Sequence, residues 1–139
     1  MSFNLFRISE QKTLKDLRQD YKQTAYDFCT QYYTNYDHYL HELASLYTPD
    51  AQFTYQNSEF TGFNNFLLKI KETGSTKFVH QDMNITAQPI GPGQMVIVVL
   101  GLITINNTIF PMKFTETLVL QRNEFNRLQI VSSIFKLIE

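Results

Sequence analysis

Apolar residues recur every three or four positions over residues 9–33, and this spacing predicts an amphipathic helix with one buried stripe. A shorter helix is predicted over 40–46, where leucines repeat at every third position before Pro49 disfavours helical geometry at its neighbour. A third helix is predicted within residues 61–75, and Gly74 is expected just past its last turn. The stripe of the first helix consists of Leu14, Leu17, Tyr21, Ala25, Phe28 and Tyr32.

From Lys77 onward the period changes to two, which is typical of β-strands. Four long strands are predicted over 77–90, 95–105, 110–121 and 127–138, and a short one over 51–57. Gly101 interrupts the apolar run of the second long strand, so a bulge or bend is expected there. Helices gathered before a curved antiparallel meander predict an α+β domain with the helices across one face of the sheet.

The 139 residues are enough for one domain with a core that needs no metal ion or disulfide bond. A net charge of -1 gives no overall attraction to nucleic acid or to an anionic membrane, so neither is expected as a direct partner. The single cysteine, Cys29, excludes an intramolecular disulfide and suits a reducing compartment. No long apolar segment indicates a signal peptide or a membrane span, and residues 1–8 are expected to be disordered.

The order of these elements and several phrases of the sequence together resemble the nuclear transport factor 2-like family. The phrases are "FCTQYYTNYDHYLHELASLYTPDAQFTY", "FTGFNNFLLKI", "QPIGPGQMVIVVLGLI", "KFTETLVLQ" and "SSIFKLI", and the resemblance covers residues 20–138. It implies a cone-shaped domain in which three helices are wrapped by a strongly curved, mainly antiparallel sheet.

In the eukaryotic transport branch of this family, the sheet face turned away from the helices pairs with a second copy or with a related domain. The resemblance places Val98, Thr117 and Ile134 in such an interface. Strand alternation adds further residues to the same face: Val96, Thr115, Val119 and Ser132. A contiguous apolar patch usually marks a partner site, and the alternative is a solvated face, which the threonines and serines allow.

The same fold also hosts isomerases and dehydratases, which implies candidate chemistry inside the cone. His80 and Asp82 are two positions apart on one predicted strand, so they are expected on the same side as a base and its orienting partner. Glu116 is expected among apolar side chains, either as a cavity carboxylate or in a buried ion pair with Arg122, Lys136 or a partner's arginine.

Other residues are weaker candidates for a catalytic or metal-binding site. The spacing of His38 and His41 permits a metal pair, but no further ligand pattern lies nearby, so no metal ion or other cofactor is expected. Cys29 is predicted to be an inert core thiol. The aromatic cluster is expected to fill the narrow end of the cone, and in an enzyme it would line a ligand pocket. It comprises Tyr26, Tyr32, Tyr33, Tyr36 and Tyr39.

The resemblance implies a role in nucleocytoplasmic transport. The family's carrier of RanGDP uses acidic residues at the mouth of its cone, whereas Gln56 replaces one of them and the loop "NNTIFPMKF" contains no acid. The chain also lacks the tryptophan with which that carrier binds Phe-Gly repeats. In these respects it is most similar to the small subunit of the heterodimeric mRNA export receptor.

The expected function is therefore that of a non-enzymatic cofactor that pairs with the large subunit of an mRNA export receptor and acts at nuclear pores, in nucleus and cytoplasm. One alternative is a homodimeric transport factor that carries RanGDP or binds Phe-Gly nucleoporins. The other is a small-molecule isomerase or dehydratase of the same fold.

Overall fold

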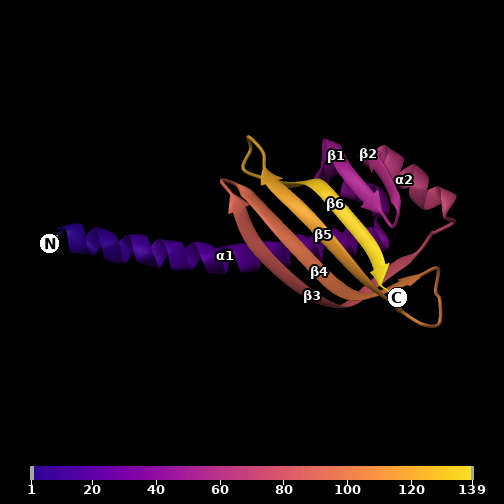
Figure 1. Cartoon of the computed structure of the whole chain (residues 1–139), viewed down its shortest axis with the longest axis horizontal. Coiled ribbons are helices and arrows are strands. Elements are labelled where there is room, and N and C mark those ends of the chain that lie inside the picture. The colour runs from indigo at the N-terminus through magenta and orange to yellow at the C-terminus, as the bar shows by residue number, and fades with distance from the viewer. Residues whose placement is uncertain (1, 139) are drawn as a thin grey trace.

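The structure is a computed structural model that describes residues 2–138, with side chains described from Asp20 onward. Helices cover one face of a strongly curved, six-stranded sheet (Figure 1). In chain order the elements are α1 (Ser2–His38), η1 (Leu40–Leu46), β1 (Tyr47–Tyr55), β2 (Ser58–Thr61), α2 (Phe63–Glu72), β3 (Phe78–Gly91), β4 (Gln94–Ile105), β5 (Met112–Arg122) and β6 (Leu128–Ile138). The predicted disorder of residues 1–8 and the inward placement of Leu14 and Leu17 fall outside the described side chains and stay predictions.

The described part of α1 packs an aromatic stripe against the concave face of the sheet. Ala25, Phe28 and Tyr32, which the helical period predicted to be buried, are 1%, 8% and 0% exposed. Tyr33 and Tyr36 widen the stripe and are also buried. One face of α1 is thus held by tertiary packing, which is the main source of helix stability in proteins.

The sheet has the strand order β2-β1-β6-β5-β4-β3, so β6 lies between β5, its antiparallel neighbour, and β1, its parallel neighbour. β1 begins at Tyr47, earlier than predicted, and includes Pro49. The register of β1 with β6 shifts between Tyr47 and Gln52, and such an irregularity tolerates a residue without an N–H. β2, which was not predicted, pairs with β1 at the edge of the sheet.

β3 contains a bulge between Gln81 and Asn84, where Asp82 has a φ of 53°. The bulge expected at Gly101 is therefore on the neighbouring strand, and β4 pairs with β5 in unbroken register through Gly101. A Cβ atom at Gly101 would lie 2.9 Å from the side chain of Met83 and 3.1 Å from the backbone oxygen of Gln81. Glycine at this position therefore permits the close approach of the bulged strand.

The predicted α+β class is confirmed: three helices lie on a curved sheet that is mainly antiparallel. The core consists of buried aromatic and aliphatic side chains between the helices and the concave side of the sheet. Within the part of the chain that the structure describes, no helix is both long and apolar enough to cross a membrane.

Candidate functional site

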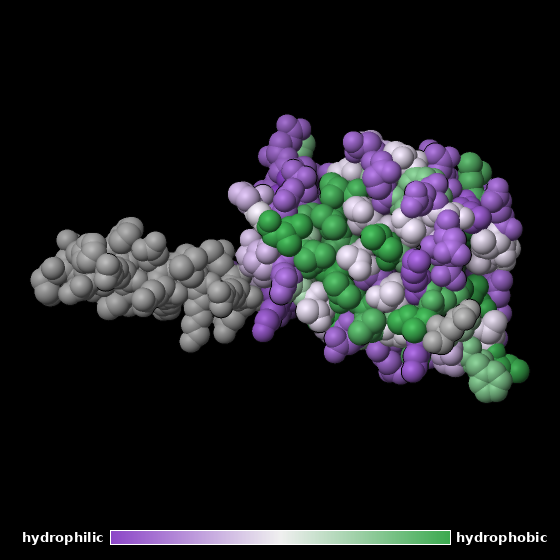
Figure 2. Space-filling model, viewed as in Figure 1, coloured by the Kyte–Doolittle hydropathy of each residue, from purple (hydrophilic) through white to green (hydrophobic). Residues whose placement is uncertain are grey.

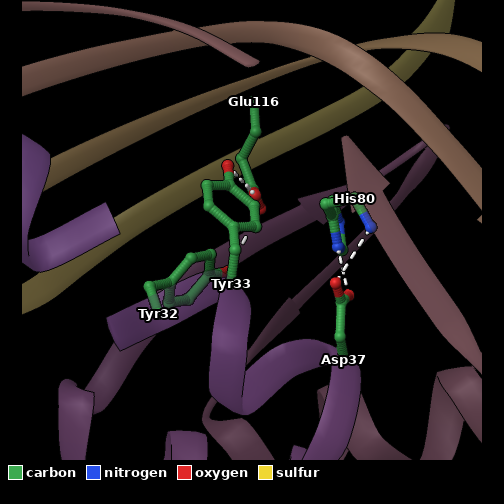
Figure 3. A network of polar contacts seen from close by, with 5 residues as sticks. All are labelled: Tyr32, Tyr33, Asp37, His80 and Glu116. Atoms are coloured by element: carbon green, nitrogen blue, oxygen red, sulfur yellow. Dashed lines mark hydrogen bonds and ion pairs between the residues drawn. The ribbon is translucent and has the colours of Figure 1, made fainter. Parts of the chain in front are cut away.

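Glu116 points from β5 into the core and is surrounded by hydroxyl groups. Its carboxylate accepts hydrogen bonds from the hydroxyls of Tyr33 at 2.8 Å and Tyr32 at 3.2 Å (Figure 3). Ser133 Oγ donates a third at 3.3 Å, and the hydroxyls of Tyr32 and Tyr47 are 2.6 Å apart. Burial raises the pKa of Glu116, which is 2% exposed, while His80 and the hydroxyl donors oppose that rise.

Neither Arg122 nor Lys136, the cations expected beside Glu116, lies there. Arg122 donates a hydrogen bond to the backbone oxygen of Asn126 at 3.0 Å, and Lys136 is exposed. Strand alternation predicts the inward direction of Glu116. Its hydrogen-bond partners come from α1 and β6, and the spacing of residues within β5 does not show that these elements lie nearby. Hydroxyl groups thus take the place of a counter-charge.

Burial also raises the pKa of the surrounding tyrosines, and the charge of Glu116 is the second cause of the rise. Tyr32, Tyr33, Tyr36 and Tyr47 are shifted well above their ordinary value, and Tyr55 to about 12. These hydroxyls therefore stay protonated at neutral pH and remain available as donors to the carboxylate.

His80 faces the core from β3 and pairs with Asp37 near the end of α1 (Figure 3). Its Nδ1 lies 2.6 Å from Asp37 Oδ1, and its backbone N–H donates to Oδ2 at 2.9 Å. The predicted pairing with Asp82 is wrong because the bulge after Gln81 breaks the alternation and leaves Asp82 exposed. Val79, before the bulge, is exposed, whereas Met83, within it, packs against the core.

The groups inside the cone are enclosed. The ring of His80 lies 4.7 Å from those of Tyr33 and Tyr36 and 5.3 Å from that of Phe114, measured between centroids. His80 is 8% exposed, and its Nε2 is buried without a hydrogen-bond partner among the described residues. This packing holds the polar groups away from any ligand in solvent. Tyr26 and Tyr39, which were expected to fill the cone as well, are instead exposed.

Cys29 is fully buried in the core, as predicted. Burial and, second, the charge of Glu116 raise the pKa of its thiol to about 12, which makes it a poor nucleophile. Among the residues with described side chains, which include His38 and His41, no group of three or more His, Cys, Asp or Glu is arranged to hold a metal ion.

The opposite face of the sheet, turned away from α1, carries the residues expected at an interface. Val98, Thr117 and Ile134 are direct neighbours across β4, β5 and β6. The two flanking rows are Val96, Val119 and Ser132 on one side and Leu100, Thr115 and Lys136 on the other. Figure 2 shows this face, with green and white side chains over its centre and purple ones around them. We call this set of residues the outer face.

The centre of the outer face is apolar but only partly covered. Val98, Leu100 and Ile134 are 37%, 48% and 43% exposed. Leu100 was missed in the sequence, although the alternation of β4 places it two positions from Val98. Charged residues occur towards the border: Lys113 and Lys136 at one end, and Glu59 on β2. An apolar centre with a polar rim is the usual anatomy of a protein–protein interface.

The sequence profile of the nuclear transport factor 2 (NTF2) domain matches residues 24–137. The chain belongs to this family. Nuclear transport factor 2 of Emericella nidulans is 28% identical to the chain over 120 residues, which cover 86% of the chain and 96% of that protein. The family resemblance seen in the sequence phrases is therefore confirmed.

Solved structures share the NTF2 fold with the chain. Nuclear transport factor 2 from Cryptosporidium parvum superposes with a TM-score of 0.77 at 21% identity, covering 85% of the chain and 94% of that protein. A chain from the complex of the yeast deubiquitinase Ubp3 and its Bre5 cofactor superposes with a TM-score of 0.66 at 20% identity, and the match covers 85% of the chain and 97% of that protein. At these identities the likeness shows the fold, and function has to be argued from the residues themselves.

Proposed function

We propose that the chain is a non-enzymatic nucleocytoplasmic transport factor that pairs through its outer face with an NTF2-like domain of another protein. The observation that carries this proposal is the row of Val98, Thr117 and Ile134, which contains no charged residue and stands at the centre of a partly exposed face. The curated relatives named as nuclear transport factors support the transport role.

The partner we propose is the NTF2-like domain in the large subunit of an mRNA export receptor, with the chain acting at nuclear pores and present in nucleus and cytoplasm. Carriage of RanGDP would call for acids at the cone mouth, because a basic surface on the GTPase needs a counter-charge. Gln56 there instead accepts a hydrogen bond from the backbone N–H of Leu137 at 3.0 Å. The β4–β5 loop presents Ile109 and Phe110, which are 88% and 81% exposed.

A homodimeric transport factor is the second candidate, favoured by the curated relatives that bear the name nuclear transport factor 2. Two copies would bury the same outer face against each other about a twofold axis. The two candidates differ in the mass of the purified chain. A homodimer has twice the chain mass of 16.3 kDa, whereas a heterodimerising chain stays at one copy until its partner is added.

The enzyme alternative has less support from the site. Glu116 and His80, the groups that would carry chemistry, are 2% and 8% exposed and are enclosed by aromatic rings. A general base needs to come within hydrogen-bond reach of a substrate proton, and neither group is accessible to a substrate in this packing.

Ile134→Glu tests the proposed interface. At a position that is 43% exposed, the isolated chain tolerates a carboxylate, but in a closed interface that carboxylate would be buried without a counter-charge. We expect the affinity for the partner domain, or for a second copy, to fall at least about a hundredfold. Light scattering measures the assembled mass, and titration with the purified partner domain measures the affinity.

The matched control is Leu68→Glu, which places the same charge at a 58% exposed leucine on α2. It should assemble as the wild type does. If Ile134→Glu assembles as well as Leu68→Glu, the outer face is not the interface.

A further inference from the structure

A hollow at one end of the sheet has chemistry that the proposed pairing does not use. It has a volume of about 630 Å3, and its walls come from the β1–β2 turn, the start of β5 and the end of β6. We call it the end hollow, and it is lined by Gln56, Asn57, Pro111, Met112, Lys113, Lys136, Leu137 and Ile138.

Hydrogen bonds fix one wall of the end hollow in place. Gln56 has a φ of 59° at the β1–β2 turn, and its backbone N–H donates to the oxygen of Phe135 at 2.9 Å. Its side-chain oxygen accepts the N–H of Leu137 at 3.0 Å. The turn is thereby tied to β6 from both backbone and side chain, so the hollow is formed before any ligand arrives, which lowers the cost of binding.

The charged residues in the described lining of the end hollow are both basic. Lys113 and Lys136 line it, and none of its described lining residues is acidic. The ion pairs among the described side chains are those of Lys69 with Glu72 and of His80 with Asp37, so neither lysine of the hollow is engaged by a described carboxylate. Glu59 lies farther along β2 and is not part of the lining.

Exposed apolar residues precede the lining residue Pro111 in the chain. The β4–β5 loop, which leads into Pro111 and extends beyond the end of the sheet in Figure 1, carries Ile109 and Phe110 at 88% and 81% exposure. Ile138 is 44% exposed. Two adjacent, almost fully exposed large apolar residues are costly in water, and such groups commonly mark a binding site.

We infer that the end hollow binds a short acidic peptide segment that carries one aromatic or aliphatic anchor residue. The ammonium groups of Lys113 and Lys136 attract the carboxylates, and Phe110 and Ile109 cover the anchor. Charge complementarity selects the acidic segment, while the apolar contact supplies most of the affinity. Lys136 belongs both to the hollow and to the outer face, whereas Lys113 and Phe110 lie outside the residues that define the outer face, so these two positions separate this binding from the proposed pairing.

Fluorescence anisotropy with three synthetic peptides tests the inference. The first has four aspartates around one phenylalanine, the second replaces the aspartates with lysines, and the third replaces the phenylalanine with serine. We expect the first to bind at least about tenfold more tightly than the other two, and to weaken as salt is added. Equal binding of the acidic and the basic peptide would overturn the inference.

Variants then locate the site on the chain. Lys113→Glu combined with Lys136→Glu should weaken the acidic peptide at least about tenfold, and Phe110→Ser should weaken it several-fold. Lys71→Glu, on the exposed side of α2, is the matched control and should bind as the wild type does. Wild-type affinity in both the double variant and Phe110→Ser would place the peptide elsewhere and overturn the inference.

Two further measurements separate this site from the proposed interface and from a lipid surface. Ile134→Glu should keep peptide binding whatever happens to its assembly, and Phe110→Ser and the single variant Lys113→Glu should keep the assembly of the wild type. If Phe110→Ser and Lys113→Glu lose assembly together with peptide binding, the hollow belongs to the interface and the inference fails. Binding to phosphatidylserine vesicles without binding to the acidic peptide would also overturn it.

Discussion

Replacing Glu116 by leucine removes the acceptor at the centre of the buried hydroxyl network. The hydroxyls of Tyr33 and Ser133 would lose the partner they reach at 2.8 and 3.3 Å, whereas Tyr32 keeps the hydroxyl of Tyr47 at 2.6 Å. The variant leaves two buried hydroxyl donors without an acceptor, but it also removes the cost of burying a carboxyl group. We therefore expect the free energy of unfolding to fall by about 2–4 kcal/mol. Urea titration followed by circular dichroism or tyrosine fluorescence measures it, since the chain has eight tyrosines and no tryptophan.

Glu116→Gln keeps the shape and one acceptor oxygen but cannot ionise, so it isolates the pH dependence. Because burial raises the pKa of the folded state above the ordinary value of 4.5, the folded chain holds this proton more tightly than the unfolded chain. Stability therefore falls as pH rises from about 4.5 through the raised pKa, by about 1.4 kcal/mol for each tenfold difference in proton affinity. The glutamine variant should lack this decline.

Glu59→Gln is the control, because Glu59 is exposed and its removal should leave the pH profile unchanged. A wild-type profile identical to that of Glu116→Gln would refute the buried, proton-binding carboxyl group. A Glu116→Leu variant as stable as the wild type at neutral pH would refute the role of the hydroxyls. The slope of the urea dependence should stay constant, which shows that the unfolded states are comparable.

Three other substitutions or modifications test the remaining contacts. Gly101→Ala should lose about 1–3 kcal/mol of unfolding free energy in urea, because its Cβ would lie 2.9 Å from Met83, and Met83→Ala in the same chain should restore part of it. Asp37→Ala should lose about 2–4 kcal/mol in the same assay, because His80 loses acceptors for both its ring and its backbone N–H. Cys29 should resist alkylation until the chain unfolds, so that its modification rate, followed by mass spectrometry, tracks unfolding; rapid labelling in native buffer would contradict its burial.

Periodicity predicts those features that depend on one element alone. The spacing of Ala25, Phe28 and Tyr32 identifies the buried side of α1, and the alternation along β5 sets Glu116 inward. In both elements the backbone repeats without interruption, so each side chain's direction follows from its position in the sequence. The family assignment rests on the same regular segments.

Features that depend on how elements meet were not accessible from the sequence. Asp82 was paired with His80 because a period of two was carried across a bulge, and Asp37 was missed because it approaches from another element. The hydroxyl partners of Glu116 likewise come from α1 and β6. Extending an alternating pattern along a strand assumes that its pairing with the neighbouring strand is unbroken. The bulge between Gln81 and Asn84 in β3 is enough to exchange the two faces.

The parallel pairing of β1 with β6 has a consequence for how the chain folds. Thr54 pairs with Ile134, so this contact joins distant parts of the chain, whereas β3 to β6 can form successively from local hairpins. Closing such a long loop is entropically expensive and tends to be slow. A partly folded chain would therefore display the meander before the β1–β2 hairpin joins β6 and completes the sheet. Because the outer face lies on β4, β5 and β6, such a chain would already present it, and assembly alone would not report that the sheet has closed.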